Sequence, residues 1–175
     1  MTQEYQNYID KVLSHWQPKP LEGAKKMIQK YGLPQEATAS RLIWYNNGPW
    51  KRTIVYRDPV PHNFPTPHID FLEQVINYRV PVGLFDEIAM FDGSVYPDRT
   101  KGEVSAKCDK EPMNFLSLNL LNDIVTRRRD VANARMFYAQ TAANFMKHNI
   151  TSPYTEGLLF TPPSNTGDPD VPYFY

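Results

Sequence analysis

The chain has 175 residues, 41% of them hydrophobic and 22% charged, which is typical of one globular domain with its own core. Its 19 basic and 19 acidic residues balance, which argues against a nucleic-acid or membrane partner. No apolar run approaches the length of a membrane span, and Cys108, the single cysteine, allows no internal disulfide. We therefore expect a soluble, cytoplasmic protein, or a periplasmic one if a signal peptide has been removed.

Two amphipathic helices are predicted at the N-terminus. Apolar residues recur at helical spacing over residues 5–16, and a second apolar face runs over residues 21–31. Pro18 and Pro20 separate the two helices, and Gly32 is a typical helix stop.

A hairpin is predicted next. The segments Arg41–Asn46 and Lys51–Asp58 are rich in β-branched and aromatic residues, and they flank an Asn-Asn-Gly-Pro turn. We expect Trp44 and Trp50 to cover the core face of this hairpin.

Residues 71–80 are ambiguous. Leu72, Ile76 and Tyr78 share the parity of one face of a strand, whereas a helix capped by Thr66 is the alternative. We predict a strand.

A short helix over residues 84–91 and a second hairpin follow. The arms of this hairpin are Ser94–Thr100 and Glu103–Cys108. Pro97 lacks an N–H group and therefore predicts an edge position or a bulge for the first arm.

Two long helices are predicted after the second hairpin. The first has Pro112 as its first helical residue and ends near Arg127–Arg129, whose charges suit the end of a helix better than a phosphate site. Asp130 can cap the second helix, whose apolar face reaches Phe145.

This order of elements predicts an α+β fold with an antiparallel sheet of about five strands, packed against an N-terminal and a C-terminal helix pair. We expect residues 1–150 to form one domain. Residues 151–175 are proline-rich but carry many aromatic side chains, so we expect a docked tail. This tail either wraps its own domain or crosses to another subunit of a homo-oligomer, and the sequence leaves both open.

Several sequence segments of the chain resemble those of an uncharacterised bacterial protein family. The resemblance spans residues 27–146 and rests on WYNNGPWKRTIVYRD, HNFPTPHID, FDGSV, RTKGEVSAKCDKE and NFLSLNLLNDIVT. It implies that these segments belong to one recurring domain, and it transfers no catalytic role.

The strongest candidate for chemistry is the segment 58–70, predicted as a rigid proline-rich loop. It carries His62, His68, Asp58 and Asp70, which could bind a divalent metal through the histidines or serve as acid and base. The spacing of the histidines matches no known metal motif. The alternative is a structural loop in which these side chains cap turns or face solvent.

Cys108 is a second candidate, because it lies between a predicted strand and the start of a helix, where a dipole could lower the pKa of a thiol. The alternative is a buried, inert cysteine. If the hairpins bring Cys108 close to His62 or His68, a Cys–His pair would be a candidate for acyl transfer.

A third candidate is an anion clamp formed by strand arginines and aromatic residues, with Arg52, Arg57, Tyr56, Arg79 and Trp50 as ligand-binding residues. The alternative is that the arginines pair with neighbouring acids, namely Asp58, Glu73, Asp98 and Glu103.

From the sequence we predict a non-enzymatic module that binds a small polar or anionic ligand or another protein. The alternatives are a hydrolase- or lyase-like enzyme that uses the 58–70 segment, with or without a metal, and a structural subunit of an oligomer. The sequence names no substrate.

Overall fold

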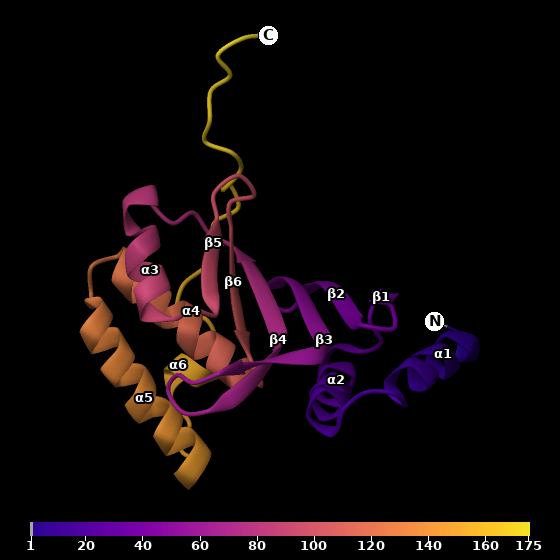
Figure 1. Cartoon of the computed structure of the whole chain (residues 1–175). Coiled ribbons are helices and arrows are strands. Elements are labelled where there is room, and N and C mark those ends of the chain that lie inside the picture. The colour runs from indigo at the N-terminus through magenta and orange to yellow at the C-terminus, as the bar shows by residue number, and fades with distance from the viewer. Residues whose placement is uncertain (1) are drawn as a thin grey trace.

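A six-stranded antiparallel sheet organises the computed structural model, which describes residues 2–175 (Figure 1). The strand order is β1-β2-β3-β4-β6-β5. The strands are β1 (Glu36–Ala37), β2 (Arg41–Asn47), β3 (Trp50–His62), β4 (His68–Asn77), β5 (Val95–Asp98) and β6 (Glu103–Cys108). The α+β prediction with an antiparallel sheet is confirmed. The additional strand is β1, which is too short to leave a sequence pattern.

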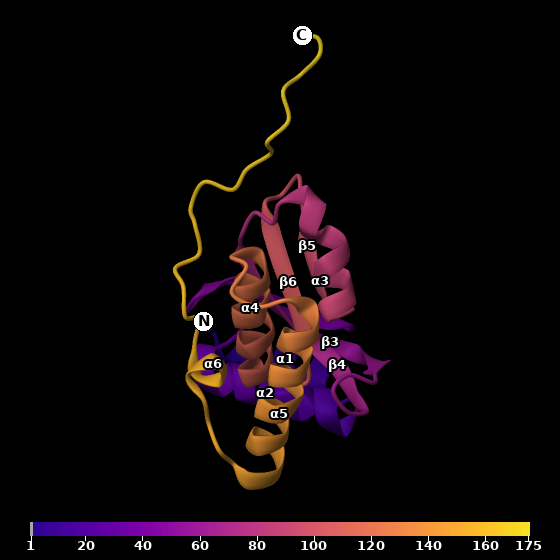
Figure 2. The ribbon, with the colours of Figure 1, turned by 90° about the vertical axis from the view of Figure 1, so that its left-hand side faces the viewer.

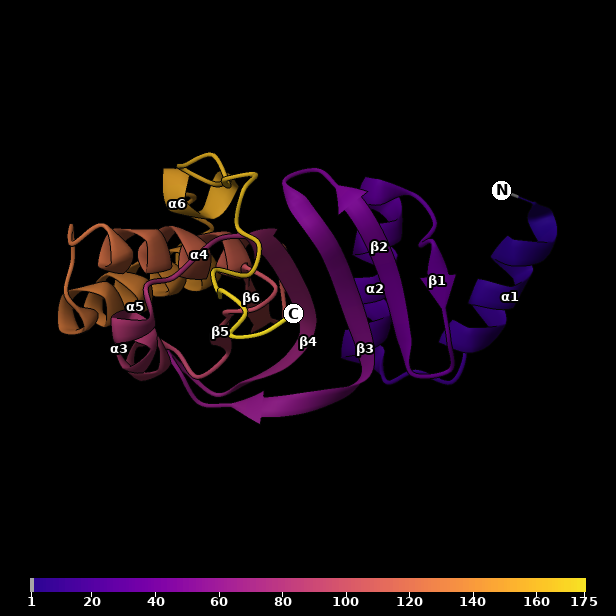
Figure 3. The same cartoon turned by 90° about the horizontal axis from the view of Figure 1, so that it is seen from above.

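Helices cover one face of the sheet in two groups. They are α1 (Gln3–Leu13), α2 (Pro18–Tyr31), α3 (Phe85–Phe91), α4 (Glu111–Val125), α5 (Val131–His148) and α6 (Pro153–Glu156). Seen from above, α2 lies against β2 and β3, whereas α4 and α5 lie beside the other end of the sheet (Figure 3). No helix within residues 2–175 is both long enough and apolar enough to cross a membrane.

The strand register explains why the helices share one face. Leu42, Val55 and Leu72 are direct neighbours across β2, β3 and β4, and all three belong to one buried core with residues of α1 and α2. Ile76 has the same parity as Leu72, so it faces the same side, and it joins the core formed with α3, α4 and α5. Two adjacent cores therefore lie on one face of a single sheet.

The predicted loop over residues 58–70 is wrong in extent. β3 continues to His62 and β4 begins at His68, so only residues 63–67 form the turn. β2 pairs with β3 only as far as Tyr56, so the end of β3 pairs with β4 alone. The prolines there are tolerated because the missing N–H groups can face the side of β3 that has no strand partner. The prediction of a strand over residues 71–80 is confirmed by β4 as far as Asn77, and β5, which contains Pro97, is an edge strand.

The C-terminal segment packs along the domain and then leaves it (Figures 1 and 2). Asn119 on α4 donates hydrogen bonds to the carbonyl oxygens of Tyr154 and Gly157, at 3.1 and 2.8 Å. Further on, Thr166 is buried against the turn between β5 and β6. Residues 171–175 are exposed.

Candidate metal centre

The hairpin formed by β3 and β4 places two histidines opposite each other. His62 and His68 are direct partners in the register, and the centres of their rings are 4.8 Å apart. Asp70 follows two residues after His68 on β4, and alternate residues of a strand point to the same side. The register therefore brings three potential metal ligands together from the two ends of one turn.

Asp70 lies between the two imidazoles. Its Oδ2 atom is 3.1 Å from His62 Nδ1, and its Oδ1 atom is 3.1 Å from His68 Nε2. Asp70 is only 5% exposed, and the Ser94 hydroxyl donates a hydrogen bond to Oδ2. Oδ1 has no hydrogen-bond partner within residues 2–175. A buried carboxylate oxygen is thus left without a donor.

The outer nitrogens of both histidines face oxygen acceptors. His68 Nδ1 lies 2.8 Å from the Thr66 carbonyl oxygen, which can only accept, so Nδ1 carries the proton and Nε2 of the neutral ring presents its lone pair to Asp70. His62 Nε2 lies 3.6 Å from Asp92 Oδ1. In metal sites, such outer contacts fix the tautomer and the orientation of a histidine ligand.

The acids around the histidines shift the proton equilibria of the cluster. Asp70 raises the pKa of His68 above its ordinary value. Burial raises the pKa of Asp92 to about 6, although the backbone N–H of Ser94 donates to Oδ1 of Asp92 at 2.8 Å and opposes this shift. Asp70 therefore favours positive charge at His68, whether a proton or a metal ion supplies it.

His62, His68 and Asp70 fit a divalent metal. One ligand atom from each of the three lies within 4.8 Å of the others. Bonds of about 2.0–2.1 Å in a tetrahedral site place ligand atoms about 3.4 Å apart, close to the Asp70–histidine distances. The two imidazoles would move toward each other on binding. Two imidazole nitrogens and one carboxylate suit zinc, and also iron or manganese.

Of the other two candidate residues, Cys108 lies close to this cluster and Asp58 does not contact it. Asp58 is separated by the irregularity in β3 between Val55 and Val60, and it forms an exposed ion pair with Arg57. Cys108 does lie close, with Sγ 3.6 Å from His68 Nε2, but it is only 3% exposed. Burial, followed by the charges of nearby acids, raises the pKa of the thiol, which opposes the reactive thiolate considered from the sequence.

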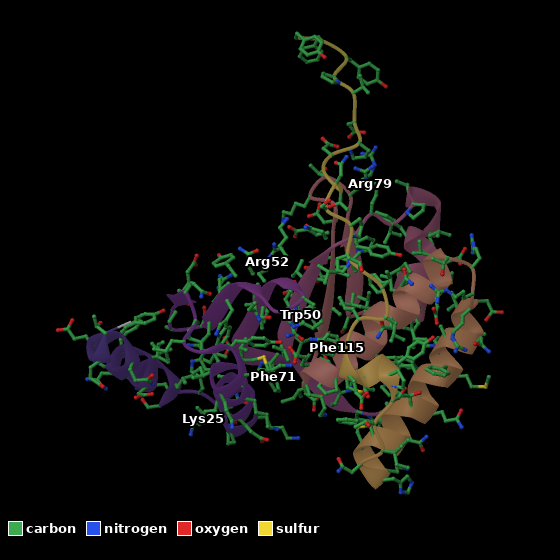
Figure 4. The ribbon with its side chains drawn as sticks, turned by 180° about the vertical axis from the view of Figure 1, so that it is seen from behind. Lys25, Trp50, Arg52, Phe71, Arg79 and Phe115 are labelled. Carbon is green, nitrogen blue, oxygen red and sulfur yellow. The ribbon has the colours of Figure 1, made fainter. Side chains whose placement is uncertain are left out.

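The predicted anion clamp is not assembled, because its members have separate partners. Arg52 and Arg79 lie well apart, and Trp50 points into the core beside Phe115 (Figure 4). The contacts are those of Arg52 with Glu103, Arg57 with Asp58, Arg79 with the Gly167 carbonyl oxygen, Tyr56 with Glu73 and Trp50 with Glu111. Two of the acids expected to neutralise arginines, Asp58 and Glu103, do so.

Sequence analysis missed Asp92 and Ser94. They follow α3 at the start of the second hairpin, outside the segments singled out as candidate sites. Asp92 is 2% exposed in the structure. In the sequence, the one sign that Asp92 is buried is its position between the apolar Phe91 and a predicted strand.

A cavity of about 350 Å³ is lined by Asp70 and Ser94, so it reaches one of the three potential ligands, although neither histidine lines it. A larger cavity of about 560 Å³ lies between α2 and the start of α4. It is lined by Met27 and Phe145 and by none of His62, His68 and Asp70.

The chain matches no protein-family model, no curated protein and no solved structure. The resemblance to an uncharacterised bacterial family therefore stays a prediction.

Proposed function

We propose that His62, His68 and Asp70 bind a divalent transition metal and that the protein is a metal-dependent hydrolase- or lyase-like enzyme. One observation carries the proposal. Both imidazoles turn one nitrogen toward the buried Asp70 carboxylate at 3.1 Å, while their other nitrogens face the Thr66 carbonyl oxygen and Asp92.

The ligand set supports catalysis rather than a purely structural role. Structural zinc sites have four protein ligands, whereas catalytic sites have three and keep a position for water or substrate. Such a metal, when bound, polarises a substrate oxygen and lowers the pKa of water. Three ligands, one of which lines a cavity, correspond to the catalytic type.

The remaining residues of the cluster position the ligands. The Thr66 carbonyl oxygen holds the proton of His68 on Nδ1 and leaves Nε2 free. Asp92 faces the outer nitrogen of His62, and the Ser94 hydroxyl holds one oxygen of Asp70. These contacts reduce the rotation of all three ligands before a metal arrives.

The test is metal binding by a matched pair of double variants. The chain has four histidines, so His15→Ala/His148→Ala, which removes the two exposed ones, is the control for His62→Ala/His68→Ala. Elemental analysis and titration calorimetry with zinc, manganese and iron(II) would be made on each protein, with circular dichroism to verify the fold. We expect one metal ion per chain in the wild type and the control, and none in the His62/His68 variant. A wild type that binds none of the three metals contradicts the proposal.

A non-enzymatic binding module is the second candidate. It is favoured by the cavity beside Asp70, which suits a small ligand whether or not a reaction follows. Assaying the metal-loaded protein with ester, phosphoester and amide substrates separates the two. Turnover that is lost in Asp70→Asn supports the enzyme, and saturable binding without turnover supports the module.

A further inference from the structure

The cavity beside Asp70 is formed by side chains from four strands. Tyr56 belongs to β3, Asp70 to β4, Tyr96 to β5 and Lys107 to β6. These strands are neighbours in the sheet, in the order β3-β4-β6-β5. Ser94 lies immediately before β5 and lines the same cavity, so one hollow connects Lys107 to Asp70, one of the three proposed metal ligands, and Asp58 lines this hollow as well.

Lys107 is a positioned cation with free donors. Its Nζ atom is 3.7 Å from a carboxylate oxygen of Glu73, beyond hydrogen-bond distance, and 5.2 Å from the centre of the Tyr96 ring. The Lys107 side chain is 36% exposed. Within the described chain, no group accepts a hydrogen bond from it. Its three N–H donors are available to a ligand in the cavity.

Glu73 forms an ion pair with Lys107 at 3.7 Å, and its hydrogen bonds come from two tyrosines instead. Tyr56 donates to one oxygen at 2.7 Å and Tyr96 donates to the other at 3.2 Å. Burial raises the pKa of Tyr56, which keeps its hydroxyl protonated as a donor. Glu73 is 5% exposed, so it fixes the two tyrosines and orients Lys107 from below the surface.

We propose, on the basis of the metal centre proposed above, that the substrate is a small molecule with a carboxylate or phosphate group, which Lys107 binds while the reacting group lies at the metal. The cavity volume of about 350 Å³ limits the substrate to a small molecule. Tyr56 and Tyr96 in the cavity lining supply apolar contact for its body. The donors of Lys107 match an anionic oxygen by charge and by hydrogen bonding.

The test compares three probes of similar size on the zinc-loaded protein. Phenylacetate and phenylphosphonate carry the two kinds of anion, and phenylacetamide is the neutral counterpart. Calorimetry should show that at least one anion binds about tenfold or more tightly than the amide, as a hydrogen bond between charged partners predicts. The tighter of the two anions identifies which group the site prefers.

Two lysine variants locate the effect. Lys107→Met should lose the preference for anions, and Lys107→Arg should keep most of it. Lys51→Met is the matched control, because Lys51 pairs with Glu103 on the same sheet and does not line the cavity. We expect Lys51→Met to bind all three probes as the wild type does.

The outcomes separate this inference from the proposed function. If Lys107→Met retains its zinc and prefers anions as strongly as the wild type, the anion binds elsewhere and the inference is wrong. A wild type without preference for either anion overturns it as well. If the wild type holds no zinc, the proposed function fails. The same three probes are then measured on the metal-free protein, which tests the role of Lys107 without a metal. If the wild type prefers the anions and Lys107→Met does not, Lys107 still forms an anion site.

Discussion

Asp70 Oδ1 and His68 Nε2 lie 3.1 Å apart, although the proton of this imidazole is held on Nδ1 by the Thr66 carbonyl oxygen. Two lone pairs that face each other at this distance inside a protein repel unless a positive charge lies between them. A proton satisfies the pair by making His68 an imidazolium, and a metal ion satisfies it by binding both atoms. The same contact thus predicts competition between protons and metal.

Zinc should stabilise the wild type against unfolding but not Asp70→Asn. A ligand that binds only the folded state adds about 2.7 kcal/mol to the free energy of unfolding at a free concentration of 100 times its Kd. Asn at this position keeps the shape of the side chain and removes the charge that the metal requires. Urea unfolding with and without zinc measures the effect. The control is Asp58→Asn, which alters an exposed acid of the same hairpin and should retain the stabilisation. Equal stabilisation of Asp70→Asn and the wild type would contradict a role of Asp70 as a ligand.

The Cys108 thiol should react slowly in the folded protein. The side chain is 3% exposed, so a thiol reagent reaches it only when the structure opens locally. We expect labelling by a coloured disulfide reagent to be at least about tenfold slower in buffer than in denaturant. Cys108→Ala should retain metal binding, since Sγ contacts His68 but is not one of the three proposed ligands. Rapid labelling of the folded protein would restore the reactive-thiol interpretation.

Much of the fold could be predicted because the two hairpins and the long helices have local signals. The turn between β2 and β3 is an example, since Asn46 and Gly48 adopt the left-handed backbone conformation that an Asn-Asn-Gly turn favours. The extent of β3 could not be predicted, because prolines were interpreted as ending the strand. Whether a missing N–H group matters depends on which side of β3 has a partner, and that is set by where β2 ends.

Only the part of the site that lies on the hairpin of β3 and β4 could be predicted from the sequence. His62, His68 and Asp70 are joined by the register of β3 and β4, so their nearness follows from local pairing. Asp92 and Ser94 precede β5, and β6 lies between β5 and β4 in the sheet. Their approach to His62 depends on how the far edge of the sheet packs, which no spacing along the chain reports.

Glu111→Gln should destabilise the protein, and the loss should depend on pH. Glu111 is 5% exposed and accepts hydrogen bonds from Tyr31, Trp50 and Gln74, and from Lys30 as an ion pair. Burial raises the pKa of Glu111, but these partners outweigh it, so the net shift is downward from 4.5. A carboxylate with a lowered pKa stabilises the fold above its ordinary pKa, and the stabilisation is lost as the pH falls through the folded-state pKa.

We expect Glu111→Gln to cost about 3 kcal/mol at pH 7, since it breaks a buried charged network. The difference from the wild type should shrink below pH 4.5, the ordinary value for Glu111. Urea unfolding between pH 3.5 and 7 measures both effects. Glu22→Gln is the control, because Glu22 forms an exposed ion pair with Lys26 and its loss should cause no measurable change. A difference that does not vary with pH would mean that the amide disrupts packing rather than charge.

Gly102→Ala should release the C-terminal segment from the sheet. Gly102 has φ +62°, and a Cβ atom added there would lie 1.5 Å from the carbonyl oxygen of Thr166. Since a backbone atom cannot yield locally, the segment around Thr166 must move, and the left-handed conformation adds about 1–2 kcal/mol of strain. Hydrogen exchange should become faster around Thr166 while the amides of β4 remain protected. Gly83→Ala is the control, because a Cβ atom there meets nothing within 4 Å. Unchanged exchange around Thr166 in Gly102→Ala would show that the segment is not held against this turn in solution.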